Sequence, residues 1–578
     1  MIVCMKSWRS LVWFFLCTLG TPAAWAADPD PSPAPAVSAL DAALFYQLLL
    51  GELQVRQGSP GAGFSILLDA ARKTRDAALF QRAVDVALQS RSGDAALQAA
   101  QAWKKELPQA QEPNRYLLQI LLALGRVEEA GQTLALSIDE LAPDEQAAAI
   151  ATIPRVFGRV ADKAQAARVV EKALAKPLRQ TATAATAWTT IGRMRRDAGL
   201  MGAAVDAALK GHASNRTAQG PLILAMSLLD QAPEALKPML DEAMAADVSP
   251  DLQLGYARAL IMRNDHQDAL RQLQLINARR PGFAPGWLLH GLLLQELNQW
   301  PKAEDMLRRF VTLAAGQDNQ EIKAGLAEAL LALSKIAQKQ GHLEQATQWL
   351  QQMPPDADPV KLASRRADLL AEQGRMEEAR QTLARIPTNT PEQAKLKALA
   401  QSQWLKEHRM AQAAYEVVRK ASEAAPNDHE LLVELALLSE KIQRYDEMEN
   451  LLRRQMKSRP QDPQAFNALG YSLADRNTRL DEARALINRA VELAPQDPYI
   501  QDSLGWVLFR QGQHQEALKV LRAAFASKPD AEIAAHLGEV LWVSGQTQQA
   551  LTIWREGLML KADNETLIET LKRFNVKP

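Results

Sequence analysis

The feature that most constrains this chain of 578 residues is a recurrence of about 34 residues that continues to its C-terminal end. Once in each unit, a small residue follows an acidic or polar pair. From residue 269 onward this position is occupied by Ala269, Ala303, Ala346, Ala379, Ala413, Met448, Ala483, Ala517 and Ala550. All but one of the steps between them are 33 to 35 residues long, and the exception is the 43-residue step after Ala303. A unit of this length holds one helical hairpin, which cannot bury its apolar face without its neighbours.

The residue types within each unit indicate two helices joined by a turn. Gly and Ala let the two helices approach closely, and apolar residues three and four apart form a buried stripe. A Pro near the end of the unit, as at Pro495 and Pro529, stops the second helix. Aromatic residues make up only 5% of the chain and β-branched residues are sparse, which favours helices over strands. Such a unit has the period of the tetratricopeptide repeat (TPR), so the sequence predicts an all-α TPR superhelical solenoid.

The chain can be divided into segments by how regular its repeats are. We expect degenerate TPR-like repeats over residues 42–245, regular TPR repeats over 246–562 and a C-terminal capping helix within 563–578. The array then holds roughly thirteen units. The 43-residue step predicts a longer loop or a lengthened helix near residues 314–320.

Residues 1–26 have the layout of a secretory signal peptide. Lys6 and Arg9 precede the apolar run 11–20, and Ala stands at positions 24 and 26 before the expected cleavage site. The apolar run is too short to span a bilayer. Residues 27–41 form a Pro-rich spacer, because alternating prolines prevent a helix there. We therefore expect export from a bacterial cytoplasm to the periplasm.

Both cysteines, Cys4 and Cys17, lie within the predicted signal peptide. The mature chain would then contain no thiol for a disulfide, a thiolate metal site or a nucleophile. A lipoprotein signal has Leu three residues before its Cys and a small residue just before it, whereas Phe14 and Leu16 stand here. An ordinary signal-peptide cysteine is the simpler interpretation of Cys17, and membrane anchoring through a lipid on Cys17 stays open as the alternative.

Composition and motifs argue against catalysis and nucleic-acid binding. The chain carries 67 basic and 67 acidic residues, without the clustered basic excess that nucleic-acid binding needs. No two of its eight histidines form a metal pair at helical spacing, and it has no phosphate-loop motif. Ser503 follows Gln501 and Asp502 in a predicted helix, not the strand and Gly of a nucleophile elbow. We therefore expect no catalytic residue, no metal and no cofactor.

The first helices of the regular repeats carry candidate partner-binding residues. In TPR arrays the second, fifth, ninth and twelfth motif positions of these helices face the ligand groove. Counted from the motif Gly at position eight, these positions in three successive units include Tyr471, Tyr499, Asp502, Trp506, Phe509, Glu539 and Trp542. Rigid aromatic side chains with a few carboxylates are typical of a protein-binding surface. The alternative is that Trp506 and Trp542 fill gaps between repeats.

Residues 467–558 resemble the C-terminal part of an exported bacterial TPR family. The resemblance rests on the motifs DSLGW (502–506) and IAAHLGEVLW (533–542), and it extends to LFYQLLLGEL (44–53) and LFQRAVDVAL (79–88). The best-understood type of this family is the outer-membrane lipoprotein adaptor of a periplasmic carboxyl-terminal processing protease. The resemblance covers nearly the whole mature chain.

The resemblance implies a spiral scaffold that assembles the processing protease and presents its substrates, which are cell-wall cross-link hydrolases. The expected function is therefore a non-catalytic periplasmic adaptor, associated with the outer membrane, that binds protein partners. A scaffold for exopolysaccharide export or for secretion machinery in the envelope is the alternative, because such machinery also uses long TPR arrays. An enzyme is disfavoured, since the sequence has no nucleophile, metal or cofactor constellation.

Overall fold

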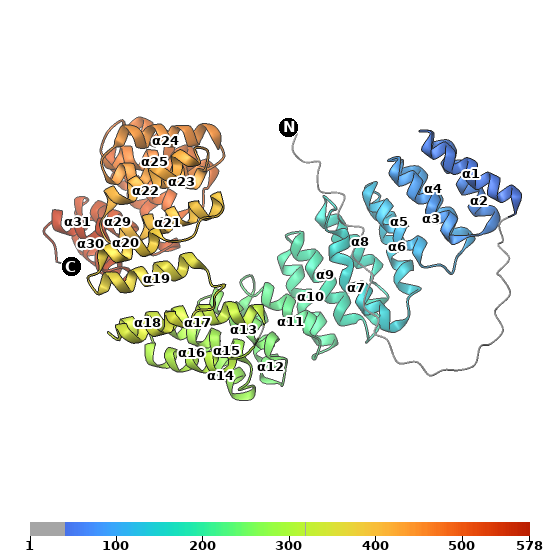
Figure 1. Ribbon diagram of the computed structural model, residues 1–578, viewed down its shortest axis with the longest axis horizontal. Coiled ribbons are helices and arrows are strands. Elements are labelled where there is room, and N and C mark those ends of the chain that lie inside the picture. The colour runs from blue at the N-terminus through green and yellow to red at the C-terminus, as the bar shows by residue number, and fades with distance from the viewer. Residues whose placement is uncertain (1–40, 318, 578) are drawn as a thin grey trace. The chain divides into compact units, whose positions relative to one another are not determined.

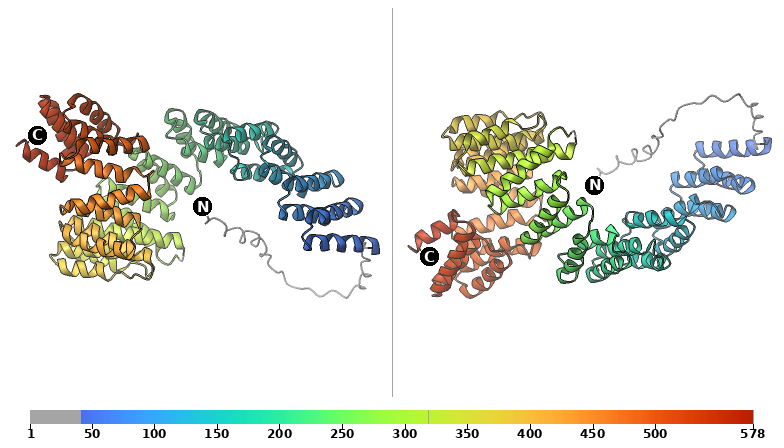
Figure 2. Two further views of the ribbon diagram at one scale, coloured as in Figure 1. Left: turned by 90° about the horizontal axis from the view of Figure 1, so that it is seen from above. Right: turned by 90° about the horizontal axis from the view of Figure 1, so that it is seen from below.

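A computed structural model describes residues 41–317 and 319–577, and these residues form α-helices and one 3-10 helix with no strand among them. The predicted signal peptide and the spacer up to residue 40 lie outside the described residues. The chain divides into two compact units, of which the first extends to Val248 and the second begins at Ser249. Within each unit, successive helices follow one another in sequence order through the stack (Figures 1 and 2). The predicted all-α solenoid is confirmed.

The first unit contains twelve described α-helices and a 3-10 helix, η1 (Pro177–Arg179). The helices are α1 (Ala42–Arg56), α2 (Pro60–Thr74), α3 (Ala77–Gln89), α4 (Gly93–Glu106), α5 (Glu112–Ala123), α6 (Val127–Asp139), α7 (Pro143–Phe157), α8 (Lys163–Ala173), α9 (Ala184–Asp197), α10 (Met201–Ser214), α11 (Gln219–Ser227) and α12 (Pro233–Ala245).

The second unit contains nineteen described α-helices, which form nine successive hairpins and a final single helix. They are α13 (Pro250–Met262), α14 (His266–Arg279), α15 (Ala284–Glu296), α16 (Trp300–Ala314), α17 (Gln320–Lys339), α18 (Leu343–Gln351), α19 (Pro359–Glu372), α20 (Met376–Ala384), α21 (Pro391–Glu407), α22 (Ala411–Ala424), α23 (His429–Lys441), α24 (Tyr445–Ser458), α25 (Pro463–Asp475), α26 (Leu480–Leu493), α27 (Pro498–Arg510), α28 (His514–Ser527), α29 (Ala531–Val543), α30 (Thr547–Leu560) and α31 (Glu565–Arg573).

Local signals in the sequence fix where the helices of a hairpin begin and end. Before α27, the Asp497 carboxylate accepts hydrogen bonds from the backbone N–H groups of Tyr499 at 2.9 Å and Ile500 at 3.3 Å. Pro498 occupies the first helical position, where its missing N–H leaves no bond unmade. The turn after α27 contains Gly512 with φ of 79°, a left-handed conformation that Gly adopts without a Cβ clash. The Asp-Pro pair and the Gly therefore delimit the first helix of this hairpin.

Close approach of the two helices in a hairpin depends on glycine. A Cβ added at Gly505 would lie 2.7 Å from Cδ2 of Leu521 on the second helix. One added at Gly538 would lie 2.5 Å from Cδ1 of the buried Trp554. Since ordinary carbon contacts begin near 3.5 Å, only Gly fits at either position. The role predicted for these recurring glycines is confirmed.

The long step between Ala303 and Ala346 has a helical cause. The first helix of this hairpin, α17, is 20 residues long, whereas α25, α27 and α29 have 13 residues each. Asn319 begins it by accepting a hydrogen bond from the N–H of Glu321 at 2.7 Å. Of the two alternatives that the sequence left open, the lengthened helix is correct.

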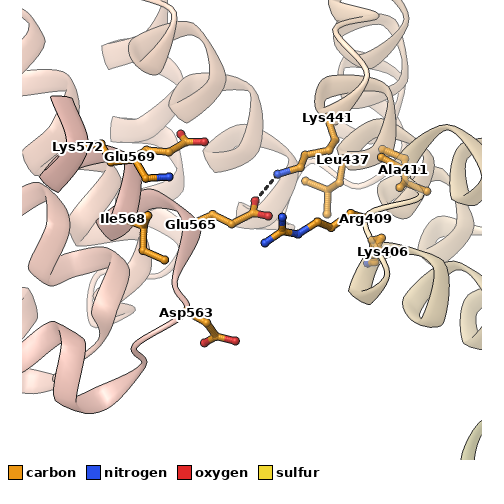
Figure 3. A pocket seen from close by; sticks show the side chains of 11 residues that line it. Lys406, Arg409, Ala411, Leu437, Lys441, Asp563, Glu565, Ile568, Glu569 and Lys572 are labelled. Carbon is orange, nitrogen blue, oxygen red and sulfur yellow. Dashed lines mark hydrogen bonds and ion pairs between the residues drawn. The ribbon is translucent and has the colours of Figure 1, made fainter. Parts of the chain in front are cut away.

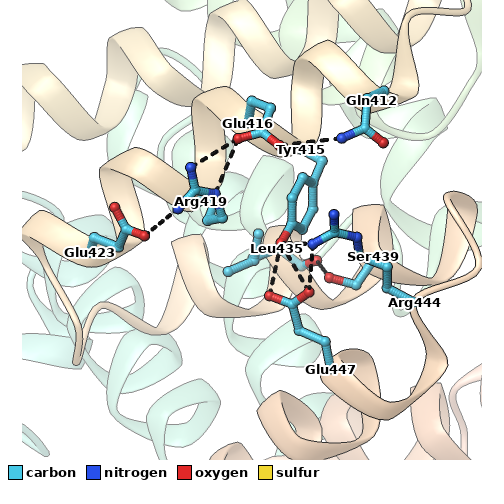
Figure 4. A network of polar contacts seen from close by, with 9 residues as sticks. All are labelled: Gln412, Tyr415, Glu416, Arg419, Glu423, Leu435, Ser439, Arg444 and Glu447. Carbon is cyan, nitrogen blue, oxygen red and sulfur yellow. Dashed lines mark hydrogen bonds and ion pairs between the residues drawn. The ribbon is translucent and has the colours of Figure 1, made fainter.

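A polar network links neighbouring hairpins at α22, α23 and α24 (Figure 4). The buried Tyr415 on α22 donates its hydroxyl hydrogen to the Glu447 carboxylate on α24, whose oxygens lie 2.9 and 3.0 Å away. Arg444, in the turn before α24, donates to the same hydroxyl oxygen at 2.8 Å and lies over the ring at 4.7 Å. Burial and Glu447 raise the pKa of Tyr415, so this hydroxyl stays protonated and continues to donate. The network holds two successive second helices in a fixed relation.

Among the described residues, none of the helices combines the length and the apolar character needed to cross a bilayer.

Candidate partner-binding surface

The seven residues predicted to bind a partner lie on three first helices that follow one another in the array. α27 packs between α25 and α29, so residues at equivalent positions of the three helices are neighbours. Tyr471 lies on α25, Tyr499, Asp502, Trp506 and Phe509 lie on α27, and Glu539 and Trp542 lie on α29.

A buried polar chain connects these three helices through His536 of α29. Its Nδ1 lies 2.8 Å from Oδ2 of Asp502 on α27, and its Nε2 lies 3.2 Å from the hydroxyl oxygen of Tyr471 on α25. Because a carboxylate only accepts hydrogen bonds, Nδ1 of His536 is the donor to Asp502. The His536 side chain is 2% exposed and that of Asp502 7% exposed. One imidazole therefore ties three successive repeats together.

The electrostatics of this chain follow from burial and from nearby carboxylates. Burial lowers the pKa of His536, but the charge of Asp502 and its hydrogen bond outweigh this effect and leave the pKa raised. Burial raises the pKa of Tyr471 well above its usual value, and the carboxylates of Glu532 and Asp475 add to the shift. The tyrosine thus remains a neutral hydroxyl. A pair made of a charged imidazole and a carboxylate is stable in the interior only because each partner compensates the other.

Trp506 is packed into the same region of the structure. Its ring stacks on His536 with centroids 4.4 Å apart and contacts Phe509 with centroids 5.3 Å apart. It is 3% exposed, so nearly all of its surface is covered by the protein itself. Its position is therefore that of a side chain that fills the space between repeats and fixes its neighbours.

The C-terminal end of the surface is held by α31. Glu539 on α29 is buried and forms an ion pair with Arg573 of α31. Burial raises the pKa of the Glu539 carboxyl, and Arg573 partly opposes that shift. Trp542 packs against Trp554 at 5.5 Å and against Phe574, directly after α31, at 6.1 Å. The final helix thus covers the last hairpin with charged and aromatic contacts.

The exposed part of the surface is smaller than the predicted set. Tyr499 is 43% exposed, and Lys528 lies over its ring at 4.7 Å. Phe509 and Trp542 are half-buried, and the neighbouring Val543 is 46% exposed. These side chains offer apolar area to a partner, whereas the buried members of the set can act only by holding them in place.

Sequence reasoning did not include His536 or Arg573 in this set. His536 lies 34 residues after Asp502, and Arg573 lies 34 residues after Glu539. This separation equals one repeat, so each pair occupies equivalent positions on neighbouring helices. The repeat length itself could have found both residues, because positions one period apart face each other across adjacent repeats.

Ser503, which was weighed above as a nucleophile, lies within a helix. It is buried in the middle of α27 and donates its hydroxyl hydrogen to the backbone oxygen of Tyr499 at 3.1 Å. Its hydroxyl group therefore forms a hydrogen bond within its own helix. In the described part of the chain, no group of three His, Cys, Asp or Glu side chains is placed to hold a metal ion.

Comparison with known proteins connects this surface to a family. The tetratricopeptide-repeat family model matches residues 446–498 and 503–558. A TPR repeat-containing protein of Pseudomonas aeruginosa is 30% identical over 202 residues, which are 35% of this chain and 34% of that protein. The match thus spans about a third of the curated relative.

Three solved structures are among those similar to this chain. Yeast Tom70 has a TM-score of 0.37 at 16% identity, over 75% of this chain and 95% of Tom70. A TPR protein of Thermus thermophilus has a TM-score of 0.29 at 19% identity, over 31% of this chain and 98% of its own. The APC/C hetero-tetramer Cut9–Hcn1 has a TM-score of 0.31 at 12% identity, over 85% of this chain and 95% of its own. The family model thus matches the part of the second unit from α24 to α30, which carries the candidate surface.

Proposed function

We propose that this protein is a non-catalytic scaffold that binds protein partners through the exposed side chains of α27 and α29. The observation that carries the proposal is that buried contacts hold the helices bearing these side chains in place. Tyr499 and Phe509 project from the same helix as Asp502 and Trp506, which are fixed by contacts to His536. A surface that is already ordered loses little conformational entropy when a partner binds.

At finer detail, we propose a periplasmic adaptor that assembles a carboxyl-terminal processing protease and presents cell-wall hydrolases to it. The signal-peptide layout of residues 1–26 supports export. The resemblance of residues 467–558 to the exported TPR family supports the choice of partners. Association with the outer membrane belongs to the same proposal.

The experiment is a pulldown from envelope extract with the chain from residue 27 as bait and mass spectrometry of the bound proteins. The test variant combines Tyr499→Ser and Val543→Ser, because both side chains are exposed and their loss leaves the core intact. The matched control combines Met262→Ser and Met559→Ser, which remove apolar side chains that are 83% and 80% exposed elsewhere in the second unit. Circular dichroism should show equal helicity for all three proteins.

We expect the original and control baits to recover a processing protease or a cell-wall hydrolase, and the test variant to lose it. Equal recovery by the test variant would place the binding surface elsewhere in the array. Recovery of polysaccharide-export or secretion components instead would replace the protease adaptor by the alternative scaffold.

A further inference from the structure

A groove in the second unit lies between α21–α23 and α31 (Figure 3). It is separate from the exposed side chains of α27 and α29. Its volume is about 660 Å³, which is within the range of ligand-binding clefts. It is lined by Lys406, Arg409, Ala411, Leu437, Leu438, Lys441, Asp563, Glu565, Ile568, Glu569 and Lys572. The lining combines both signs of charge with an apolar floor.

The two walls of this groove carry opposite charges. The wall from α21 to α23 contributes three cations, Lys406, Arg409 and Lys441, and no carboxylate. The opposite wall contributes Asp563, Glu565 and Glu569, with Lys572 among them. A single ion pair crosses between them, from Nζ of Lys441 to Oε2 of Glu565 at 2.5 Å. These two residues are 124 positions apart, so the contact depends on how the array curves.

The contacts of Glu565 show that the cationic wall can bind a carboxylate. Figure 3 shows its carboxylate between the ammonium group of Lys441 and the guanidinium group of Arg409. The hydrogen bond from Lys441 and the charge of Lys441 lower the pKa of Glu565, and Arg409 adds to the effect. The side chains of Lys441 and Glu565 are 62% and 59% exposed. Such an exposed pair is weak and can exchange for an external carboxylate.

Arg409 reaches the groove from the turn between the helices of its hairpin. It lies two residues after α21 and two before α22, with φ of 59°. At the same place, other hairpins of this unit have Gly341, Gly374, Gly512 and Gly545 with φ between 75° and 81°, or Asn264, Asn298 and Gln443 with φ between 57° and 64°. This turn position therefore accepts side chains in several hairpins, and in this one the side chain adds a cation to the groove.

We propose that this groove binds an acidic peptide segment of a partner, and that Glu565 occupies the position of one of its carboxylates. A carboxylate of the incoming segment pairs with Lys441 and Arg409 and displaces Glu565. The planar guanidinium of Arg409 can hold a carboxylate through two parallel hydrogen bonds. Within the described residues Arg409 and Lys572 form no ion pair in the unliganded chain, so both are available.

The other lining residues favour a peptide over a nucleic acid. The apolar floor of Leu437, Leu438 and Ile568 suits the aliphatic parts of peptide side chains. None of its lining residues lies on α27 or α29, so this groove and the surface of those helices can be tested with separate substitutions.

The test measures fluorescence anisotropy of a fluorescein-labelled hexaglutamate peptide titrated with the chain from residue 27 at low ionic strength. Arg409→Gly should weaken binding about tenfold, since it removes a charge-assisted contact. Because Gly suits the left-handed turn, its thermal midpoint should be unchanged or higher. Lys441→Gln should weaken binding similarly, while Glu565→Gln should tighten it about two- to fivefold by removing the internal competitor.

Arg91→Gly is the matched control, because Arg91 has φ of 57° at the equivalent turn between α3 and α4. It should leave peptide binding unchanged. The proposal is overturned if Arg409→Gly binds hexaglutamate as well as the original chain, or if Glu565→Gln does not bind it more tightly. It is also overturned if a labelled oligothymidylate of equal charge binds with the same affinity and shows the same losses.

Discussion

Gly538→Ala tests the closest helix approach in the last hairpin. The new Cβ would lie 2.5 Å from Cδ1 and 2.6 Å from Cε2 of Trp554. Trp554 is fully buried, and its ring packs against Trp542 at 5.5 Å and Phe574 at 6.0 Å. The indole is therefore enclosed on several sides and cannot swing away without moving α30 or α31.

Two destabilising effects and one stabilising effect determine the change in local stability. Overpacking a closed core costs about 1–3 kcal/mol. Shifting the indole also weakens the hydrogen bond from Nε1 of Trp554 to the oxygen of Ala535, which is 3.3 Å long and worth about 1 kcal/mol. Replacing Gly by Ala in a helix returns about 1 kcal/mol. We expect a net loss of about 1–3 kcal/mol from local stability.

Hydrogen exchange read by mass spectrometry is the suitable assay, because a repeat array loses stability locally rather than as one two-state unit. Protection should fall in peptides from α29 to α31 and stay unchanged in the first unit. Gly202→Ala is the control: Gly202 lies in the first turn of α10 with nothing near its would-be Cβ, so this variant should gain about 0.5–1 kcal/mol. Unchanged or increased protection in α29–α31 of Gly538→Ala would refute the close packing of Trp554.

Three further changes test the contacts between helices and repeats. Gly505→Leu should destabilise α27 and α28 by about 3 kcal/mol or more, as severe overpacking of a core does. Unaltered thermal unfolding would contradict the tight contact with Leu521. Asp502→Asn should remove about 3–5 kcal/mol by leaving His536 without its countercharge. Because the pKa of His536 is raised in the folded chain, the stabilisation is complete below about pH 6.5 and disappears as the pH rises through the folded-state pKa. Denaturant titrations across this range should show the trend in the original chain and not in Asp502→Asn. Tyr415→Phe should lose about 1 kcal/mol, since its partners are partly exposed, and hydrogen exchange in α22–α24 would show no change if the network contributes nothing.

The sequence was sufficient to predict the hairpins because their signals are local. The small residue that recurs about every 34 residues lies near the start of the second helix, as Ala517 does in α28 and Ala550 does in α30. Pro498 and Gly512 mark the limits of α27 through the backbone conformations that these residues favour. These features depend on a few neighbouring positions, which one sequence displays in full.

The exposure of individual side chains was harder to predict. Trp506 occupies a motif position expected to face the groove, yet the ring of His536 from the next repeat covers it. Burial at such a position depends on how closely two repeats stack, and that distance is set by side chains of both. The ion pair between Lys441 and Glu565 depends on the accumulated rotation of several repeats.

Polar pairs one repeat apart give the array a defined stacking that apolar packing alone would leave variable. Ala and Leu surfaces tolerate small rotations between helices, since their contacts are non-directional. The bond from His536 to Asp502 requires one orientation, because a hydrogen bond weakens steeply when it bends. If the pair fixes the rotation between α27 and α29, it also fixes the separation of Tyr499 from Val543 across the proposed surface. Asp502→Asn should then weaken partner binding even at a pH and temperature where the array stays folded, whereas Tyr415→Phe should not.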